Sequence, residues 1–328
     1  MPYISTVNNI MSDVFKPAWW LPTSHLQTVW PTLSNRKILL TTKRERFELP
    51  DGDFVDLDWC GSSDGPLIFI LHGLGGSANS PYAKGIMKAC SERGWRVVLM
   101  HFRGCSGHIN RLPRTYHSGE TEDFDTVLKA IVKREQPSKV AAIGYSLGGN
   151  VLLKWLGENH SDNPLTAAVA VSVPMDLPKA ADRMQQGFSK IYQWYLIRGL
   201  RQNIQKKFSL IDSPISLDNI THWRNFWEFD DKVTAPLHGF NGVYDYYHQA
   251  SSRRYIKNIK TPTLIIHAKD DPFMTQDVIP KADELSDYTQ LLVSEKGGHV
   301  GFISGHTPGR AEYWLEQRIP NYLAEALE

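Results

Sequence analysis

The chain has 328 residues, of which 41% are hydrophobic and 22% are charged, a composition that is typical of a globular protein and excludes wholesale disorder. Lys and Arg number 36 against 35 for Asp and Glu, so the net charge of +1 does not indicate a nucleic-acid-binding protein. The three cysteines (Cys60, Cys90 and Cys105) lack a C-x-x-C spacing, which argues against a disulfide scaffold or a cysteine zinc site and favours a reducing compartment.

No apolar run reaches the roughly 18 residues that a membrane span needs. Residues 1–16 lack a basic stretch followed by an apolar one, so the sequence predicts no secretory signal. We therefore expect a cytoplasmic protein. The composition leaves contact with a membrane surface open, and it gives no indication of the oligomeric state.

The first predicted elements are two short runs, residues 46–49 and 54–59, on either side of a Pro-Asp-Gly turn, which indicate an antiparallel hairpin at a sheet edge. Continuous apolar runs follow, as is typical of parallel strands buried on both faces; they lie at residues 66–71, 96–102, 139–143, 167–173 and 262–266. Between them, apolar residues recur with helical spacing, as from Phe124 to Val132. The alternation predicts an α/β fold with right-handed crossovers.

The alternation of predicted strands and helices stops after Val173 and resumes at Thr261. Residues 188–247 contain 13 aromatic residues in 60, about 22% against 11% for the whole chain. We expect residues 176–258 to form an inserted helical cap on a core made of residues 1–175 and 259–328. The alternative is that these aromatic residues only enlarge the hydrophobic core.

A Gly-Tyr-Ser-Leu-Gly string, residues 144–148, follows a predicted strand and precedes a helical pattern. Strand, G-x-S-x-G and helix in this order are typical of a nucleophile elbow, a strained turn that exposes Ser146 at its apex. Side chains in place of Gly144 and Gly148 would collide with the neighbouring strand and helix. Ser146 is therefore the candidate nucleophile.

A serine hydroxyl needs a base, and the base needs an orienting acid. In folds with such an elbow the acid and then the histidine follow the serine along the chain. Asp270 and Asp271 end a predicted strand, and His299 lies in a glycine-flanked loop after the strand at residues 291–293. We predict a Ser146–Asp271–His299 triad; exchanging Asp271 for Asp270 would not alter the mechanism.

The developing oxyanion requires hydrogen-bond donors, and the backbone amides of Leu74 and Leu147 are the candidates. Leu74 lies in a glycine-rich loop that begins at His72, and His72 itself is interpreted as a structural turn residue. Residues 73–78 also satisfy G-x-G-x-x-A, a dinucleotide-binding pattern. That alternative is disfavoured because the next strand ends in Phe102-Arg103 and not in an acidic residue.

No metal site is predicted from the remaining residues. The sequence contains neither G-K-[ST] nor H-E-x-x-H, and the spacing of His101, His108 and His117 matches no ligand pattern, so these histidines are interpreted as solvated loop residues. Cys105 is interpreted as a buried small residue and not as a second nucleophile.

Several strings beyond the elbow resemble the YheT-like branch of the alpha/beta-hydrolase superfamily. They are WLPTSHLQT at residues 20–28, FRGCSG at 102–107, YHSGETED at 116–123, AKDDPF at 268–273 and GGHVG at 297–301. The resemblance implies an eight-stranded, mostly parallel sheet, a helical cap after the sixth strand, and hydrolysis of carboxylic esters by a serine. Related eukaryotic proteins carry acylglycerol lipase, phospholipase or acyl-alcohol transferase activities. His25 and Tyr116-His117 in these strings have no mechanism that the sequence alone supplies.

We therefore expect a serine hydrolase of short- to medium-chain acyl esters or acylglycerols, with no cofactor and no metal. Its expected partner is a small-molecule ester, with no nucleic acid. The alternatives are an acyl-alcohol transferase that uses the same triad, and a non-catalytic ligand-binding protein with the same fold. The natural substrate and the acyl chain length are not encoded in any motif.

Overall fold

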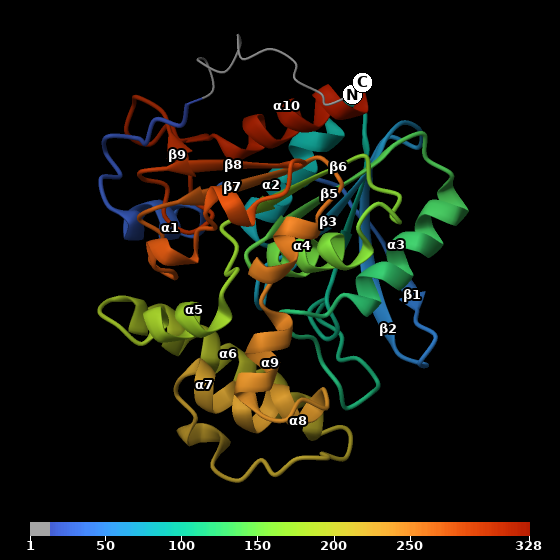
Figure 1. The fold of residues 1–328 in the computed structure, drawn as a ribbon, viewed down its shortest axis with the longest axis vertical. Coiled ribbons are helices and arrows are strands. Elements are labelled where there is room, and N and C mark those ends of the chain that lie inside the picture. Colours follow the sequence, from blue (N-terminus) through green and yellow to red (C-terminus); the bar gives the residue numbers. More distant parts are fainter. Residues whose placement is uncertain (1–13) are drawn as a thin grey trace.

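The computed structural model describes residues 14–328, so the prediction about a leader in residues 1–16 falls almost entirely outside the described chain. Within this range the main sheet contains eight strands in the order β1-β2-β4-β3-β5-β6-β7-β8 (Figure 1). The pairs β1–β2 and β2–β4 are antiparallel and the others are parallel. The strands are β1 (Lys43–Glu48), β2 (Phe54–Gly61), β3 (Leu67–Leu71), β4 (Arg96–Met100), β5 (Val140–Tyr145), β6 (Ala167–Val171), β7 (Thr263–Ala268) and β8 (Thr289–Ser294). The predicted eight-stranded, mostly parallel α/β fold is confirmed.

The apolar runs became strands because their side chains are buried on both faces of the sheet. In β3, Leu67, Phe69 and Leu71 belong to one hydrophobic core, while Ile68 and Ile70 belong to the other. Helices α3 (Glu122–Glu135) and α4 (Leu147–Asn159) contribute side chains to the first core. Helices α2 (Pro81–Ser91) and α10 (Leu315–Leu327) contribute to the second, so the sheet lies between two helical layers.

The chain leaves the sheet after β6 and returns to it at β7, in agreement with the gap between predicted strands after Val173. Figure 1 shows the helices of this segment gathered below the sheet. They are α5 (Leu177–Met184), α6 (Ser189–Phe208), α7 (Phe226–Phe229), α8 (Ala235–Leu237) and α9 (Val243–Ala250), with a π-helical turn, η3 (Asp230–Thr234), and two short 3-10 helices, η2 (Ile220–His222) and η4 (Arg253–Asn258). Two small hydrophobic clusters lie within this segment, one around Tyr246 and Tyr247 and one around Ile197 and Phe229.

Helix α1 (Ser24–Leu33), which precedes the sheet in the chain, and a short antiparallel ribbon, which follows β8, complete the fold. The ribbon pairs β9 (Ile303–Ser304) with β10 (Glu312–Tyr313). Two short 3-10 helices, η5 (Gln276–Val278) and η6 (Ala282–Glu284), lie between β7 and β8. None of the helices in residues 14–328 combines the length and apolar composition that a bilayer crossing requires.

A buried polar network explains part of the FRGCSG and YHSGETED strings. The Arg103 guanidinium donates two hydrogen bonds to Asp123, at 2.7 and 2.6 Å, and a third to Asp53 at 2.9 Å. Asn110 donates to Asp53 and accepts a hydrogen bond from the Lys207 ammonium, both at 2.6 Å. Burial lowers the pKa of Lys207 to about 8. Because buried charges need partners, this network fixes α6 and the start of α3 against the loop that follows β4.

Candidate active site

Ser146 lies at the turn between β5 and α4, with a φ of +51° and a ψ of −117°. A non-glycine residue in this region is strained, as is common at functional sites. The flanking glycines are required by space. A Cβ at Gly144 would lie 2.5 Å from the carbonyl oxygen of Gly148, and one at Gly148 would lie 2.5 Å from that of Leu71. A side chain at either glycine would therefore collide with the neighbouring helix or strand, as predicted.

The structure brings the three predicted triad residues into hydrogen-bond contact. His299 Nε2 lies 3.0 Å from Ser146 Oγ, and His299 Nδ1 lies 2.8 Å from a carboxylate oxygen of Asp271. Asp271 is buried, and its other oxygen accepts a hydrogen bond from the Phe273 amide at 2.8 Å. The Phe273 ring stacks on the imidazole with centroids 4.0 Å apart. In this geometry the imidazole can accept the serine proton while Asp271 fixes its orientation.

Asp270 has a different partner. Its carboxylate accepts a hydrogen bond from the Gly298 amide at 2.9 Å, within the loop that carries His299. Burial, together with the negative charge of Asp271, raises the pKa of Asp270. The two adjacent aspartates therefore serve the histidine in different ways, one through its ring and the other through its loop.

Residues of the HLQT string also hold the histidine loop, a role that the sequence did not reveal. The Thr28 hydroxyl donates to the Ser24 carbonyl at 2.8 Å and accepts from the His299 amide at 2.9 Å. Gln27 is buried, and its amide side chain accepts from the Ile303 amide at 2.7 Å and donates to the Ile303 carbonyl at 3.1 Å. Helix α1 thus fixes the backbone on both sides of the histidine.

Two further contacts complete this support. The Ser172 hydroxyl, at the end of β6, accepts a hydrogen bond from the Val300 amide at 3.0 Å. Ser172 also has a positive φ, of +51°. His25 lies outside the triad: its Nδ1 is 3.1 Å from the Tyr192 hydroxyl, and its ring packs on Phe188.

We predict that Thr28→Val lowers kcat for an ester substrate on the order of tenfold, because the His299 amide loses its acceptor and the loop loosens. Thr28→Ser keeps the hydroxyl and should retain activity within about twofold. Steady-state kinetics on both variants, with KM recorded separately, tests this role. Equal activity of the Val and Ser variants would show that the Thr28 hydroxyl does not position the histidine.

The predicted oxyanion loop is held by two tyrosines. The Tyr82 hydroxyl accepts a hydrogen bond from the Gly73 amide at 2.8 Å, and the Tyr116 hydroxyl accepts one from the Gly75 amide at 2.9 Å. Tyr116, from the YHSGETED string, stacks on Phe102. Its role is therefore to support the loop that contains Leu74.

His72 is fully buried at the start of this loop, and it is a structural residue as predicted. Its Nδ1 donates to the Gly73 carbonyl at 2.7 Å, and its Nε2 accepts from the Phe102 amide at 3.2 Å. Burial lowers the pKa of His72 to about 3. The ring therefore stays neutral and joins the ends of β3 and β4.

A mainly apolar cavity of about 100 Å³ opens beside the nucleophile. Its lining combines the elbow and the loops of the sheet with α5, α6 and η3; the residues include Leu74, Ser146, Leu147, Leu177, Ala180, Ala181, Met184, Leu196, Phe226, Asp230, Tyr247, Phe273 and His299. A second cavity of about 90 Å³ shares Leu74, Leu147, Phe226 and Asp230 with the first. The two residues whose amides are the candidate oxyanion donors, Leu74 and Leu147, thus line both cavities.

Asp230 is the single acidic side chain in these walls among the described residues. It accepts hydrogen bonds from the Thr234 hydroxyl at 2.6 Å and the Tyr247 hydroxyl at 2.8 Å. Burial raises its pKa to about 6. Above this pH the carboxylate places a negative charge beside a mainly apolar site.

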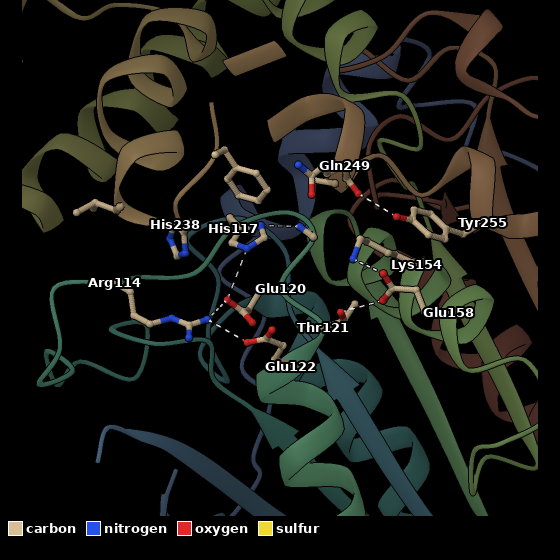
Figure 2. A pocket seen from close by; sticks show the side chains of 14 residues that line it. Arg114, His117, Glu120, Thr121, Glu122, Lys154, Glu158, His238, Gln249 and Tyr255 are labelled. Carbon is tan, nitrogen blue, oxygen red and sulfur yellow. Dashed lines mark hydrogen bonds and ion pairs between the residues drawn. The ribbon is translucent and has the colours of Figure 1, made fainter. Parts of the chain in front are cut away.

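A larger cavity, about 510 Å³, lies elsewhere, and its lining includes charged side chains that pair with one another (Figure 2). In its wall, one ring nitrogen each of His117 and His238 and one carboxylate oxygen of Glu120 lie within 4.8 Å of one another. The Gly119 amide donates to Nδ1 of His117 at 3.1 Å, so the neutral ring carries its proton on Nε2, the nitrogen that faces Glu120. Arg114 already donates to Glu120 at 2.6 Å. This protonation and pairing do not suit a metal ion.

The interpretation of three histidines as solvated loop residues was wrong for two of them. His101 is buried, with Nε2 2.9 Å from a carboxylate oxygen of Asp58, and His117 is largely buried. Only His108 is exposed, and it lies 3.3 Å from Asp56. Spacing alone could not show that β2 would place Asp58 beside His101, or that His238 and Phe240 would pack against His117.

The three cysteines are free. Cys105 is partly buried, and burial raises the pKa of its thiol to about 12. A thiol with so high a pKa forms almost no thiolate near neutral pH and is a poor nucleophile. Ser146 therefore has no competitor in Cys105.

Comparison with known proteins shows the family to which the chain belongs. Residues 66–306 match the family described as alpha/beta hydrolase fold. YheT of Escherichia coli, named as a candidate esterase, is 45% identical over 323 residues, which cover 97% of this chain and 95% of that protein. Phospholipase ABHD3 of Bos taurus is 27% identical over 93% of this chain and 77% of its own length.

Among solved structures, an esterase of Pyrococcus furiosus, Pf2001, superposes with a TM-score of 0.58. The match covers 88% of this chain and 92% of the esterase at 16% sequence identity. At this identity the likeness shows a shared fold and nothing more specific.

Proposed function

Because the chain belongs to the YheT-like branch of the alpha/beta hydrolase family, we propose that this esterase- or lipase-type protein cleaves carboxylic esters through an acyl-enzyme on Ser146. The observation that carries the proposal is the position of His299, with one ring nitrogen on Ser146 Oγ and the other on a buried carboxylate. A histidine held in this way is a general base for the serine.

In the proposed reaction, Ser146 Oγ attacks the ester carbonyl carbon as His299 Nε2 takes the hydroxyl proton. The backbone amides of Leu74 and Leu147 stabilise the negative charge that develops on the carbonyl oxygen. The carbon–oxygen bond to the alcohol then breaks, and His299 gives its proton to the departing alkoxide. In the second half of the reaction, His299 takes a proton from water, which attacks the acyl carbon. The bond to Ser146 Oγ then breaks, Ser146 regains its proton from His299, and the carboxylic acid is released. Asp271 stabilises the imidazolium that forms twice in each turnover.

We further propose that residues 176–258 act as a cap on the core of residues 1–175 and 259–328. Side chains from α5, α6 and η3 line the cavity beside Ser146, and few of these are charged. An apolar cavity of this kind suits an acyl chain and shields that chain from bulk water. The relative named as a phospholipase is consistent with acyl esters of lipids as the substrate class.

We predict that turnover of p-nitrophenyl esters rises from acetyl to butyryl and then levels off or falls. Each buried methylene contributes about 0.8 kcal/mol, close to fourfold in kcat/KM if it is realised in the transition state. Small anionic esters should be poor substrates above pH 6, because Asp230 then carries a negative charge. Kinetics on a series from acetyl to dodecanoyl measures the preference, and the same series with glycerol as competing acceptor measures acyl transfer.

The variant Ala180→Leu places extra side-chain volume in the cavity wall. It should reduce the preference for butyryl over acetyl while leaving acetyl turnover within about threefold. A maximum at acetyl in the wild type would mean that the aromatic segment packs without forming an acyl site. Absence of turnover with every ester would favour a non-catalytic binding protein.

A further inference from the structure

The outer face of α6 has an unusual composition for a solvent-exposed helix. Phe188, which precedes the helix, is 51% exposed, and Ile191, Trp194 and Tyr195 on its first two turns are 52%, 55% and 71% exposed. Positions three, four and seven residues apart share one face of a helix. The four side chains, referred to below as the α6 patch, therefore form one apolar stripe where polar residues are expected.

The same helix is strongly basic. It contains Lys190, Arg198, Arg201, Lys206 and Lys207 and no acidic residue. Lys207 is buried against Asn110, but Lys190, Arg198 and Lys206 are exposed. The Arg198 guanidinium lies 5.5 Å from the Trp194 ring centroid, so positive charge and aromatic surface occur together.

The α6 patch lies close to the candidate catalytic histidine. Phe188 contacts Tyr192 with ring centroids 5.8 Å apart, and Tyr192 contacts Phe273 at 5.0 Å. Phe273 stacks on His299 at 4.0 Å. Leu196, on another side of the same helix, lines the cavity at Ser146. A surface that binds the α6 patch would therefore lie near the cavity.

We infer that the α6 patch docks this protein on an anionic phospholipid bilayer. Trp, Tyr and Phe side chains partition into the headgroup region, and Lys and Arg beside them are attracted to anionic lipid. A second copy of the chain fits this surface less well, because a two-fold contact would bring two basic helices together. Binding does not require turnover, so the inference stands independently of the proposed reaction.

The test is sedimentation with vesicles of phosphatidylcholine alone or mixed with phosphatidylglycerol, using both the wild type and Ser146→Ala. Both proteins should bind the mixed vesicles at least tenfold more strongly than phosphatidylcholine alone, and added salt should weaken the binding. The double variant Ile191→Ser/Trp194→Ser should lose at least tenfold in binding. Hydrolysis of a soluble ester by this double variant, with Ser146 intact, should stay within about twofold, because both altered side chains point to solvent.

Matched controls use exposed residues elsewhere. Tyr288→Ser removes an aromatic side chain that is 46% exposed outside α6 and should not change binding. Lys190→Gln/Arg198→Gln should weaken binding to mixed vesicles, whereas Lys133→Gln/Lys257→Gln, with the same loss of charge, should not. The inference would be overturned if the protein bound both vesicle types equally, or if the variants and their controls lost binding equally. It would also be overturned if the wild type were a dimer and the double variant a monomer.

Discussion

Replacing Ser146 with alanine should lower kcat/KM for p-nitrophenyl butyrate by roughly 10⁴- to 10⁶-fold, because the members of a triad act as a unit. The hydroxyl is 3.0 Å from His299 Nε2, and Cys105 offers no alternative nucleophile because its pKa is raised to about 12. A fluorophosphonate probe should label the wild type at Ser146 and leave the alanine variant unlabelled. Labelling of another serine in the wild type would refute the assignment.

Two further variants separate loss of chemistry from loss of fold. Ser209→Ala changes an exposed serine and should keep full activity. Ser146→Gly should be as inactive as the alanine variant, yet it should unfold at a higher temperature than alanine, because glycine relieves the strain of a φ of +51°. A glycine variant that is no more stable than the alanine variant would show that the φ of Ser146 does not strain the turn.

The strands could be predicted because burial on both faces leaves a mark in the local sequence. Every residue of β3 is buried, so an uninterrupted apolar run was sufficient to find it. The elbow could be predicted because its glycines are needed for local steric reasons. The strands β9 and β10, of two residues each, leave no such mark, and the sequence did not reveal them.

The support of the histidine loop could not be predicted, because its partners are distant in sequence. Thr28 and His299 are separated by 271 residues and Gln27 and Ile303 by 276. No periodicity or turn signal links such positions; the resemblance marked the HLQT string without giving it a role. The prediction that His101 is solvated was wrong for a related reason, because only the pairing of strands in the sheet brings Asp58 of β2 beside it.

The last prediction distinguishes the two adjacent aspartates. Asp271→Asn should lower kcat by roughly 10³- to 10⁴-fold, whereas Asp270→Asn should cost less than about tenfold. In Asp270→Asn the side-chain oxygen can still accept from the Gly298 amide, so the loop keeps its hydrogen bond. The effect at Asp271 has a more specific cause than the loss of charge.

The Phe273 amide donates to one carboxylate oxygen of Asp271, and His299 Nδ1 faces the other. An asparagine side chain must keep its single oxygen toward Phe273, which places its NH₂ group against Nδ1. Nδ1 must then accept a hydrogen bond, so the neutral ring carries its proton on Nε2 and cannot take the proton of Ser146. Kinetics of both variants on one ester, with unfolding temperatures measured in parallel, tests the assignment: a greater loss in Asp270→Asn at equal stability would reverse the roles of the two residues.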